Sequence, residues 1–101
     1  MNKVLLVGRV TTDPQEHTFE NGNVKTSFGL ATKESYKDKN EDWQETTEFH
    51  NIVMFKKTRF QKGDLVSIEG KNKTRSFGDS DNKKYITEVV ATHTALESRP
   101  K

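Results

Sequence analysis

Cysteine is absent from the 101-residue sequence. This absence excludes disulfides, a thiol nucleophile and any metal site that needs cysteine ligands. Long apolar runs are also missing. The first residues, Met-Asn-Lys-Val-Leu-Leu-Val-Gly, contain too short an apolar stretch for a signal peptide, and no other stretch approaches the length of a membrane span. We therefore expect a soluble intracellular protein with no membrane partner.

Hydrophobic residues are scarce, at 30% of the sequence, whereas charged residues make up 32%. A chain of this length forms one domain, residues 1–101, and its core must be thin. Disorder is not expected, because the apolar residues occur in periodic clusters and the net charge is only +2. So small a net charge is no argument for a nucleic-acid partner, and the placement of the charges carries more information.

The patterns of an active site or a metal centre are missing as well. His17, His50 and His93 lie far apart, without metal-ligand spacing. The stretch 79–82, Asp-Ser-Asp-Asn, resembles the start of a calcium loop but lacks its glycine and its closing glutamate. The glycines are scattered singly, and no serine or threonine lies in a nucleophile motif. We expect no catalytic residue, no metal and no cofactor, so an enzyme such as a nuclease is a remote alternative.

The strongest apolar cluster is residues 47–55, whose length, β-branched residues and aromatics predict a strand. Alternation in a strand would put apolar groups on both of its faces. One face carries Phe49, Asn51, Val53 and Phe55, and the other carries His50, Ile52 and Met54. Two interpretations remain open: a strand buried on both sides, or a strand with a closed core on one side and a stacking platform on the other.

Similar signals predict strands over residues 3–11, 16–20, 24–31, 64–77 and 84–96. Asn21-Gly22 predicts a hairpin turn between the second and third of these, and the polar stretch 32–42 predicts a flexible loop. Residues 56–63 leave room for at most about two helical turns. Five main strands with one short connection predict an all-β, five-stranded antiparallel barrel, because closure removes exposed sheet edges. A helix between the third and fourth of these main strands, at 47–55 and 64–77, would be short or absent.

Cations and aromatics alternate along three segments. Lys71, Lys73, Arg75 and Phe77 repeat at a spacing of two, so one face of a strand would carry all four. The strand at 47–55 adds Phe49 and Phe55, and the 32–42 loop adds Lys33, Tyr36, Lys37 and Lys39. This combination is typical of sequence-tolerant binding to single-stranded nucleic acid, because every base has a π face and every nucleotide a phosphate. The alternative is a solvated outer face with a few core aromatics.

Ten stretches match one known family in order and spacing. They are Asn2-Lys-Val-Leu-Leu-Val-Gly-Arg, Asp13-Pro14, Asn21-Gly22, Phe28-Gly-Leu-Ala-Thr, Glu34-Ser-Tyr-Lys-Asp-Lys, Trp43-Gln-Glu-Thr-Thr-Glu-Phe-His, Lys62-Gly63, Val66-Ser-Ile-Glu-Gly70, Lys73-Thr-Arg-Ser-Phe and Tyr85-Ile-Thr-Glu-Val-Val. On these residues the sequence resembles the bacterial-type single-stranded DNA-binding protein family, whose members are oligonucleotide-binding (OB) fold barrels. The resemblance implies sequence-nonspecific binding and protection of single-stranded DNA in replication, recombination and repair.

The resemblance also implies roles for individual residues. The base-stacking aromatics of the family are carried here by Tyr36, Phe49, Phe55 and Phe77, and retained basic positions are Lys33, Lys37, Lys57, Lys73 and Arg75. Combined with the alternating pattern, the predicted nucleic-acid-binding set is Lys33, Tyr36, Lys37, Trp43, Phe49, Phe55, Lys57, Lys71, Lys73, Arg75 and Phe77.

Self-association is expected from the Val/Leu-rich strand at the start of the chain, because an unpaired edge of such a strand invites pairing with a second copy. The resemblance implies a homotetramer, which we favour over a homodimer. The predicted interface residues are Lys3, Val4, Leu6 and His50.

Residues 94–101 lack the acidic tip through which the family recruits replication and repair enzymes. We therefore expect no docking of such partners through this end, which belongs either to a truncated chain or to a short version of the kind that phages and plasmids encode. A primosomal or recombination accessory protein of the same barrel class, acting as an adaptor, is the main alternative. The resemblance implies a location in the bacterial cytoplasm.

Overall fold

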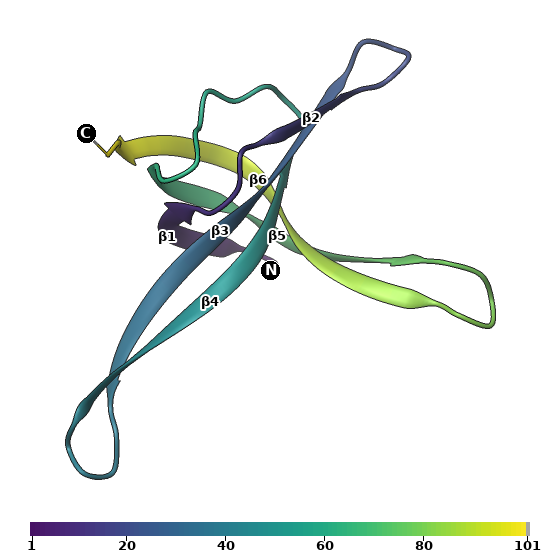
Figure 1. Cartoon of the computed structure of the whole chain (residues 1–101). Coiled ribbons are helices and arrows are strands. Elements are labelled where there is room, and N and C mark those ends of the chain that lie inside the picture. The colour runs from purple at the N-terminus through teal and green to yellow at the C-terminus, as the bar shows by residue number, and fades with distance from the viewer. Residues whose placement is uncertain (101) are drawn as a thin grey trace.

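All regular elements of the computed structural model, which describes residues 1–100, are strands (Figure 1). They are β1 (Val4–Val10), β2 (Gln15–Thr18), β3 (Val24–Lys37), β4 (Trp43–Met54), β5 (Leu65–Phe77) and β6 (Lys84–Ser98). No helix of these residues is long and apolar enough to cross a membrane. Lys101, the last residue of the predicted basic end, lies outside the described residues.

Five of the strands close into a barrel, as predicted. β1 pairs with β5, β5 with β6, β6 with β4 and β4 with β3, and a short ladder of Arg9 with Ala31 and Val10 with Leu30 joins β1 back to β3. The short β2 pairs only with β3, as the second arm of the predicted Asn21-Gly22 hairpin. A Cβ on Gly8 would overlap the backbone carbonyl of Ala31, so only glycine permits this closure.

One junction of the barrel is parallel, which corrects the prediction that all of its pairs are antiparallel. Ile52 of β4 pairs with Val89 of β6, and Val53 pairs with Val90, with both strands running in the same direction. The cause is the segment 56–64, which carries the chain from β4 to β1, where β5 pairs. When β6 turns back from β5, it reaches β4 in the parallel orientation. Alternating hydrophobicity reveals the faces of a strand but not its neighbours.

The core inside the barrel is small. Its fully buried apolar side chains come from alternate positions of five strands: Val10, Phe28, Leu30, Ile52, Met54, Val66, Ile68 and Val89. Phe60 packs against this cluster from the segment 56–64, with its ring edge-on to Phe28 at 5.9 Å between centroids. Phe60 thus adds to the core from outside the strands.

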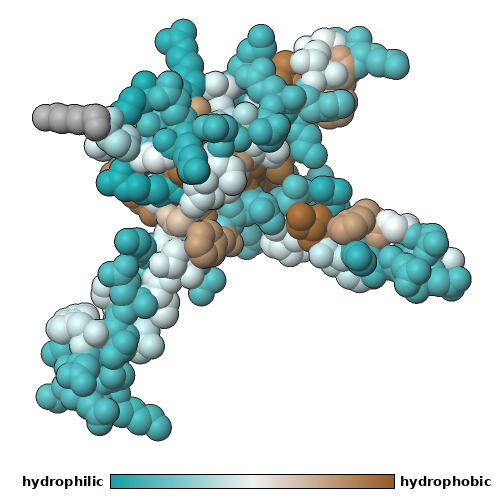
Figure 2. Space-filling view, in the orientation of Figure 1, coloured by the Kyte–Doolittle hydropathy of each residue, from teal (hydrophilic) through white to brown (hydrophobic). Residues whose placement is uncertain are grey.

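Two long hairpins, formed by β3 with β4 and by β5 with β6, extend beyond the barrel (Figure 1). We call them the β3–β4 arm and the β5–β6 arm, and their surfaces are mainly hydrophilic (Figure 2). The radius of gyration, 16.0 Å, exceeds the roughly 13 Å of a compact domain of this length. The predicted loop at 32–42 is wrong in its extent, because β3 continues to Lys37 and pairs there with Trp43. An arm exposed on both faces needs polar residues throughout, and this polarity resembled that of a loop.

The tip of the β3–β4 arm is organised by one carboxylate. Asp38 accepts hydrogen bonds from the backbone N–H groups of Asn40, at 2.8 Å, and Asp42, at 3.0 Å, and from the side chain of Gln44, at 3.1 Å. These donors, led by the N–H of Asp42, lower the pKa of Asp38. The tip is therefore a structured turn of the kind that aspartate favours.

The segment 56–64 closes one end of the barrel without forming a helix. The sequence had left open whether the connection between the third and fourth main strands contains a short helix or none, and the structure has none. The buried Asp64 accepts hydrogen bonds from Nε of Arg99, at 3.1 Å, and from its Nη2, at 3.0 Å. The N–H of Gln61 donates to the same carboxylate at 2.8 Å. The backbone of Val10 exchanges two further hydrogen bonds with Gly63 and Asp64. The segment 56–64 is thus fastened to both β1 and the end of β6.

This arrangement predicts acid sensitivity. Hydrogen bonding from Arg99 lowers the pKa of Asp64 below its ordinary value of 3.8, although burial acts in the opposite direction. A carboxyl group whose pKa is lowered by folding stabilises the fold above its unfolded pKa, and this stabilisation is lost as the pH falls through the folded value. We expect the unfolding midpoint in denaturant to drop between about pH 5 and about pH 2.

The variant Asp64→Asn should be less stable than the parent at neutral pH and should lose less stability on acidification. The exposed Asp13→Asn is the matched control, with the parent's midpoint and pH profile expected. If Asp64→Asn and the parent showed the same drop, the carboxylate would not be responsible.

Candidate nucleic-acid interface

One outer face runs without a break across β3, β4, β6 and β5. Directly opposed residues of neighbouring strands point to the same side of a sheet. Phe49 opposes Ala31, Val53 pairs with Val90, and Val90 opposes Lys71, so the chain of pairs links the four strands. By this register the face carries Lys33, Lys37, Trp43, Phe49, Lys71, Lys73, Arg75 and Phe77. We call it the outer face. Together with Phe55, which directly follows β4 and lines a groove with Lys71 and Lys73, it holds nine of the eleven predicted residues.

The aromatics of the outer face are exposed. The exposed fraction is 73% for Phe49, 62% for Phe55 and 47% for Phe77, whereas Ile52 and Met54 on the opposite side of β4 are at most 1% exposed. This difference decides between the two interpretations of residues 47–55. One side of β4 belongs to the core, and the other presents flat apolar rings to solvent.

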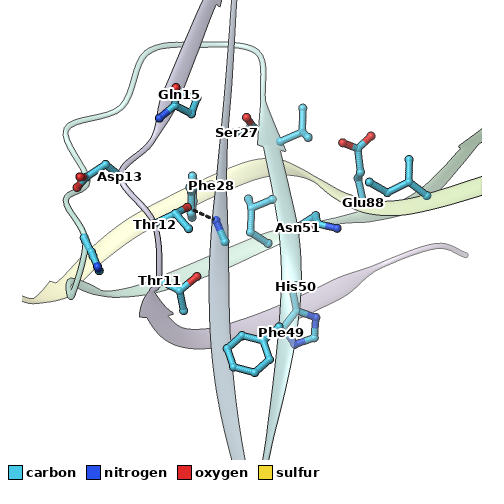
Figure 3. A pocket seen from close by; sticks show the side chains of 15 residues that line it. Thr11, Thr12, Asp13, Gln15, Ser27, Phe28, Phe49, His50, Asn51 and Glu88 are labelled. Atoms are coloured by element: carbon cyan, nitrogen blue, oxygen red, sulfur yellow. Dashed lines mark hydrogen bonds between the residues drawn. The ribbon is translucent and has the colours of Figure 1, made fainter. Parts of the chain in front are cut away.

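Two grooves lie side by side on the outer face and share Val53 and Glu88 in their linings. The first, which we call the Phe49 groove, has a volume of about 730 Å³ and is lined by polar groups that include Asp13, Gln15 and Asn51 (Figure 3). Its wall at residues 11–12 is held against β3, where Thr12 Oγ1 accepts a hydrogen bond from the N–H of Gly29 at 2.9 Å.

The second, which we call the Phe55 groove, has a volume of about 490 Å³. Phe55 follows the last residue of β4 and lies here among five cations, namely Lys25, Lys56, Lys71, Lys73 and Arg75. The Phe49 groove, by contrast, is lined by one lysine and two carboxylates. The two grooves therefore differ in charge although they share one floor.

Several cations of the outer face already have partners. Arg75 Nε lies 2.8 Å from Glu88 Oε1, and Lys33 Nζ lies 3.4 Å from Glu45 Oε1. The ammonium of Lys37 lies 5.3 Å from the ring centroid of Trp43, as in a cation–π contact. Within residues 1–100, no carboxylate lies within 4.0 Å of the ammonium group of Lys71 or Lys73, so these two are more available to an anion than Arg75.

Two predicted residues lie apart from the outer face. Tyr36 opposes Gln44 and so points to the other side of the β3–β4 arm, and Lys57 lies in the segment 56–64 and lines neither groove. Sequence reasoning missed Lys25 and Lys56, although the alternation of β3 puts Lys25 on the same side as Ser27 and Gly29. It also missed Tyr85, which is exposed and opposes Ser76 on the other side of the β5–β6 arm.

The edge of β1 differs from its prediction in which side chains are exposed. β1 pairs with β5 over Val4–Arg9 but with β3 only through Arg9 and Val10, so most of its second edge has no strand neighbour within the described chain. The predicted interface residues Val4 and Leu6 pack against the core instead, and the exposed side chains are Leu5, at 68%, and Val7, at 60%. Adjacent strand residues point to opposite sides, so Leu5 and Val7 are the apolar side chains that this edge presents to solvent.

The other two predicted interface residues have partners within the chain. Lys3 pairs with Glu69 at 3.0 Å, which lowers the pKa of that glutamate. His50 is half-buried on the core side of β4, and its Nε2 lies 2.9 Å from Thr32 Oγ1. Residues 1–100 contain no group of three or more histidine or acidic side chains arranged to hold a metal ion.

"Single-stranded DNA-binding protein 1" of Chlorobaculum tepidum is 40% identical over 100 residues, which cover 91% of this chain and 62% of the relative. The chain thus spans less than two thirds of that protein's length. A solved Plasmodium falciparum SSB complex with ssDNA has a TM-score of 0.87 at 27% identity, with 97% of this chain and 96% of that chain covered.

Two further structures support the fold. The single-stranded DNA binding protein from Thermus aquaticus, in a deletion mutant, has a TM-score of 0.86 at 21% identity and covers 97% of this chain and 51% of that one. The small single-stranded DNA-binding protein from Streptomyces coelicolor has a TM-score of 0.71 at 22% identity, with 94% and 93% covered. These likenesses confirm the predicted OB-fold barrel. The model of the single-strand binding protein family matches residues 1–96, and the chain belongs to this family.

Proposed function

We propose that this chain binds single-stranded DNA with little regard to sequence and covers it in replication, recombination and repair. The observation that carries the proposal is the outer face, on which exposed aromatic rings and cations lie together across four strands. The Plasmodium falciparum relative, similar over nearly the whole chain, was solved with single-stranded DNA. The single-strand binding protein family is non-catalytic, so no chemistry on the DNA is proposed.

In this mechanism bases stack on Phe49, Phe55 and Phe77, while phosphates lie against the cations of the Phe55 groove. Stacking on phenylalanine tolerates any base, because every base has a π face. Lys71 and Lys73, like Lys25 and Lys56, bind phosphate more readily than Arg75, since none of the four has to leave a carboxylate first. Lys33, Lys37, Trp43 and Tyr36 extend the contact along and around the β3–β4 arm. Lys57 extends it beyond Phe55 into the segment 56–64.

The alternative function, an accessory adaptor of the same barrel class, makes a different demand on the outer face. An adaptor needs a partner protein there and has little need of solvent-exposed aromatics beside unpaired lysines. Binding stoichiometry on oligo-dT, measured with and without a partner helicase, distinguishes the DNA-covering function from the adaptor function.

A bacterial cytoplasmic location is part of the proposal.

The proposal is tested by the salt dependence of binding. Neutralising Z phosphates on a single strand gives a slope of log affinity against log salt of about −0.7Z. With the five cations of the Phe55 groove engaged, the slope should be steeper than about −3. In the double variant Lys71→Gln/Lys73→Gln, whose fold is checked by thermal melting, the slope should become shallower by about 1.4. A flat salt response of the parent would contradict the electrostatic part of the mechanism.

We further propose that the chain is a homo-oligomer, a tetramer rather than a dimer, assembled through the unpaired edge of β1. Exposed Leu5 and Val7 beside this edge are the apolar groups that a second copy would cover. The variant Leu5→Lys/Val7→Lys should reduce the mass measured by light scattering at micromolar concentration. Tyr85→Lys, which adds a charge at an exposed aromatic on the β5–β6 arm, should leave the mass unchanged. A monomeric parent would refute this assembly.

A further inference from the structure

Glu88 is the one carboxylate that lines both grooves of the outer face. It lies on β6 beside Val90, on the side of the sheet that carries Lys71 and Arg75. Its side chain is only 13% exposed, so it belongs to the floor between the two grooves and not to a solvated rim. A carboxylate in the middle of a surface that attracts phosphates weakens that attraction, so its presence calls for another use.

The two oxygens of Glu88 are in different states. Oε1 accepts a hydrogen bond from Nε of Arg75 at 2.8 Å, which fixes the orientation of the carboxylate. Oε2 accepts no hydrogen bond from any residue among 1–100. Every buried side-chain oxygen and nitrogen in this part of the chain has a partner, so Oε2 is reached by solvent from the grooves. It is a fixed, unoccupied acceptor in the floor.

We infer that Glu88 accepts a hydrogen bond from the amino group of a base stacked on Phe49 or Phe55, and so gives the protein a preference for cytosine over uracil. This inference rests on the proposed binding of single-stranded DNA. A carboxylate accepts a hydrogen bond from the N4 amino group of cytosine, a recognised base-edge contact. Thymine and uracil offer only N3–H, between two carbonyl oxygens that repel a carboxylate.

Arg75 supports the same contact by binding the backbone of the nucleotide whose base Glu88 contacts. It donates to Glu88 through Nε alone among the described residues, so its remaining N–H groups are free for a phosphate of the same nucleotide. The pair therefore holds one acceptor for a base and several donors for the backbone. Phosphate contacts position a strand and base contacts specify it.

The test compares oligo-dC with oligo-dU of equal length at neutral pH, because these bases differ only at position 4 and in the proton at N3. We expect the parent to bind dC more tightly than dU by about fivefold, the lower end for one base-edge contact. In Glu88→Gln the ratio should fall to about one, because an amide both donates and accepts. Affinity for oligo-dU should rise, because the substitution removes a negative charge from among the cations of the Phe55 groove.

Glu45→Gln is the matched control. Glu45 also pairs with a cation, Lys33, but lines neither groove, so this variant removes the same charge and should keep the dC-to-dU ratio of the parent. A ratio that falls equally in both variants, or that stays unchanged in Glu88→Gln, would overturn the inference while leaving the proposed function intact. A parent that binds neither oligonucleotide would overturn the proposed function itself.

A second measurement does not depend on how the variant folds. An oligonucleotide of 2-pyrimidinone, which is cytosine without its amino group, should bind the parent about as weakly as oligo-dU. If it bound the parent as tightly as oligo-dC, the amino group would not be read and the inference would fail.

Discussion

Replacing both Phe49 and Phe55 with alanine should weaken binding to oligo-dT by about 2–6 kcal/mol, the sum of two lost base–aromatic stacks. Both rings are exposed on the outer face, so their removal leaves no cavity in the core. Six residues of strand separate them by roughly 20 Å, far enough for their contributions to add. Fluorescence anisotropy of a labelled oligonucleotide measures the loss, and a melting curve confirms the fold.

The β5–β6 arm supplies a matched pair of controls. Phe77 and Tyr85 are both exposed aromatics near its tip, but they point to opposite sides of the two-stranded ribbon. Phe77→Ala should cost about 1–3 kcal/mol of binding, and Tyr85→Ala should cost little. Equal losses from both variants would show that the strand wraps the arm and does not follow the outer face. No loss from the Phe49 and Phe55 replacements would place the stacking platform elsewhere.

A large loss of stability is expected from Gly70→Ala. Gly70 lies at a register shift of the β5–β6 ladder, and an added Cβ would overlap the carbonyl oxygen of Val90 and lie 2.9 Å from the Cα of Ala91. These are backbone atoms of a barrel strand, so no side-chain rotation relieves the contact. We expect a loss of about 3 kcal/mol or more in the free energy of unfolding, measured by denaturant titration.

Gly22→Ala is the control for this substitution. Gly22 has a φ of 88° in the hairpin between β2 and β3, and an added Cβ there meets nothing within 4 Å. Its cost is only that of left-handed backbone in alanine, about 1 kcal/mol. A Gly70→Ala protein as stable as Gly22→Ala would show that β6 shifts easily at this point.

Alternation along single strands predicted the outer face well. Lys71, Lys73, Arg75 and Phe77 lie on one side of β5 because strand side chains have a period of two, which the sequence displays directly. In β1 the period gives no such information, because four consecutive apolar residues conceal which side faces inward. Only the pairing of Leu6 with the buried Ile68 shows it.

Contacts between distant segments were beyond sequence reasoning. Asp64 and Arg99 are 35 residues apart, and a partly buried ion pair leaves no local pattern. The shared floor of the two grooves depends on the parallel pairing of β4 with β6, which no periodicity encodes. The place of Glu88 between the two grooves could not be predicted for this reason. Its neighbours on the outer face come from other strands.

The alternating sides of the two arms limit which insertions and deletions their strands can accept. Because the side chains of a ribbon alternate, inserting one residue into β5 between Gly70 and Arg75 would turn every cation beyond it to the side of Tyr85. Inserting two residues in each strand of an arm would lengthen the ribbon and keep its sides unchanged. Relatives with longer or shorter arms should therefore differ from this chain by even numbers of residues per strand.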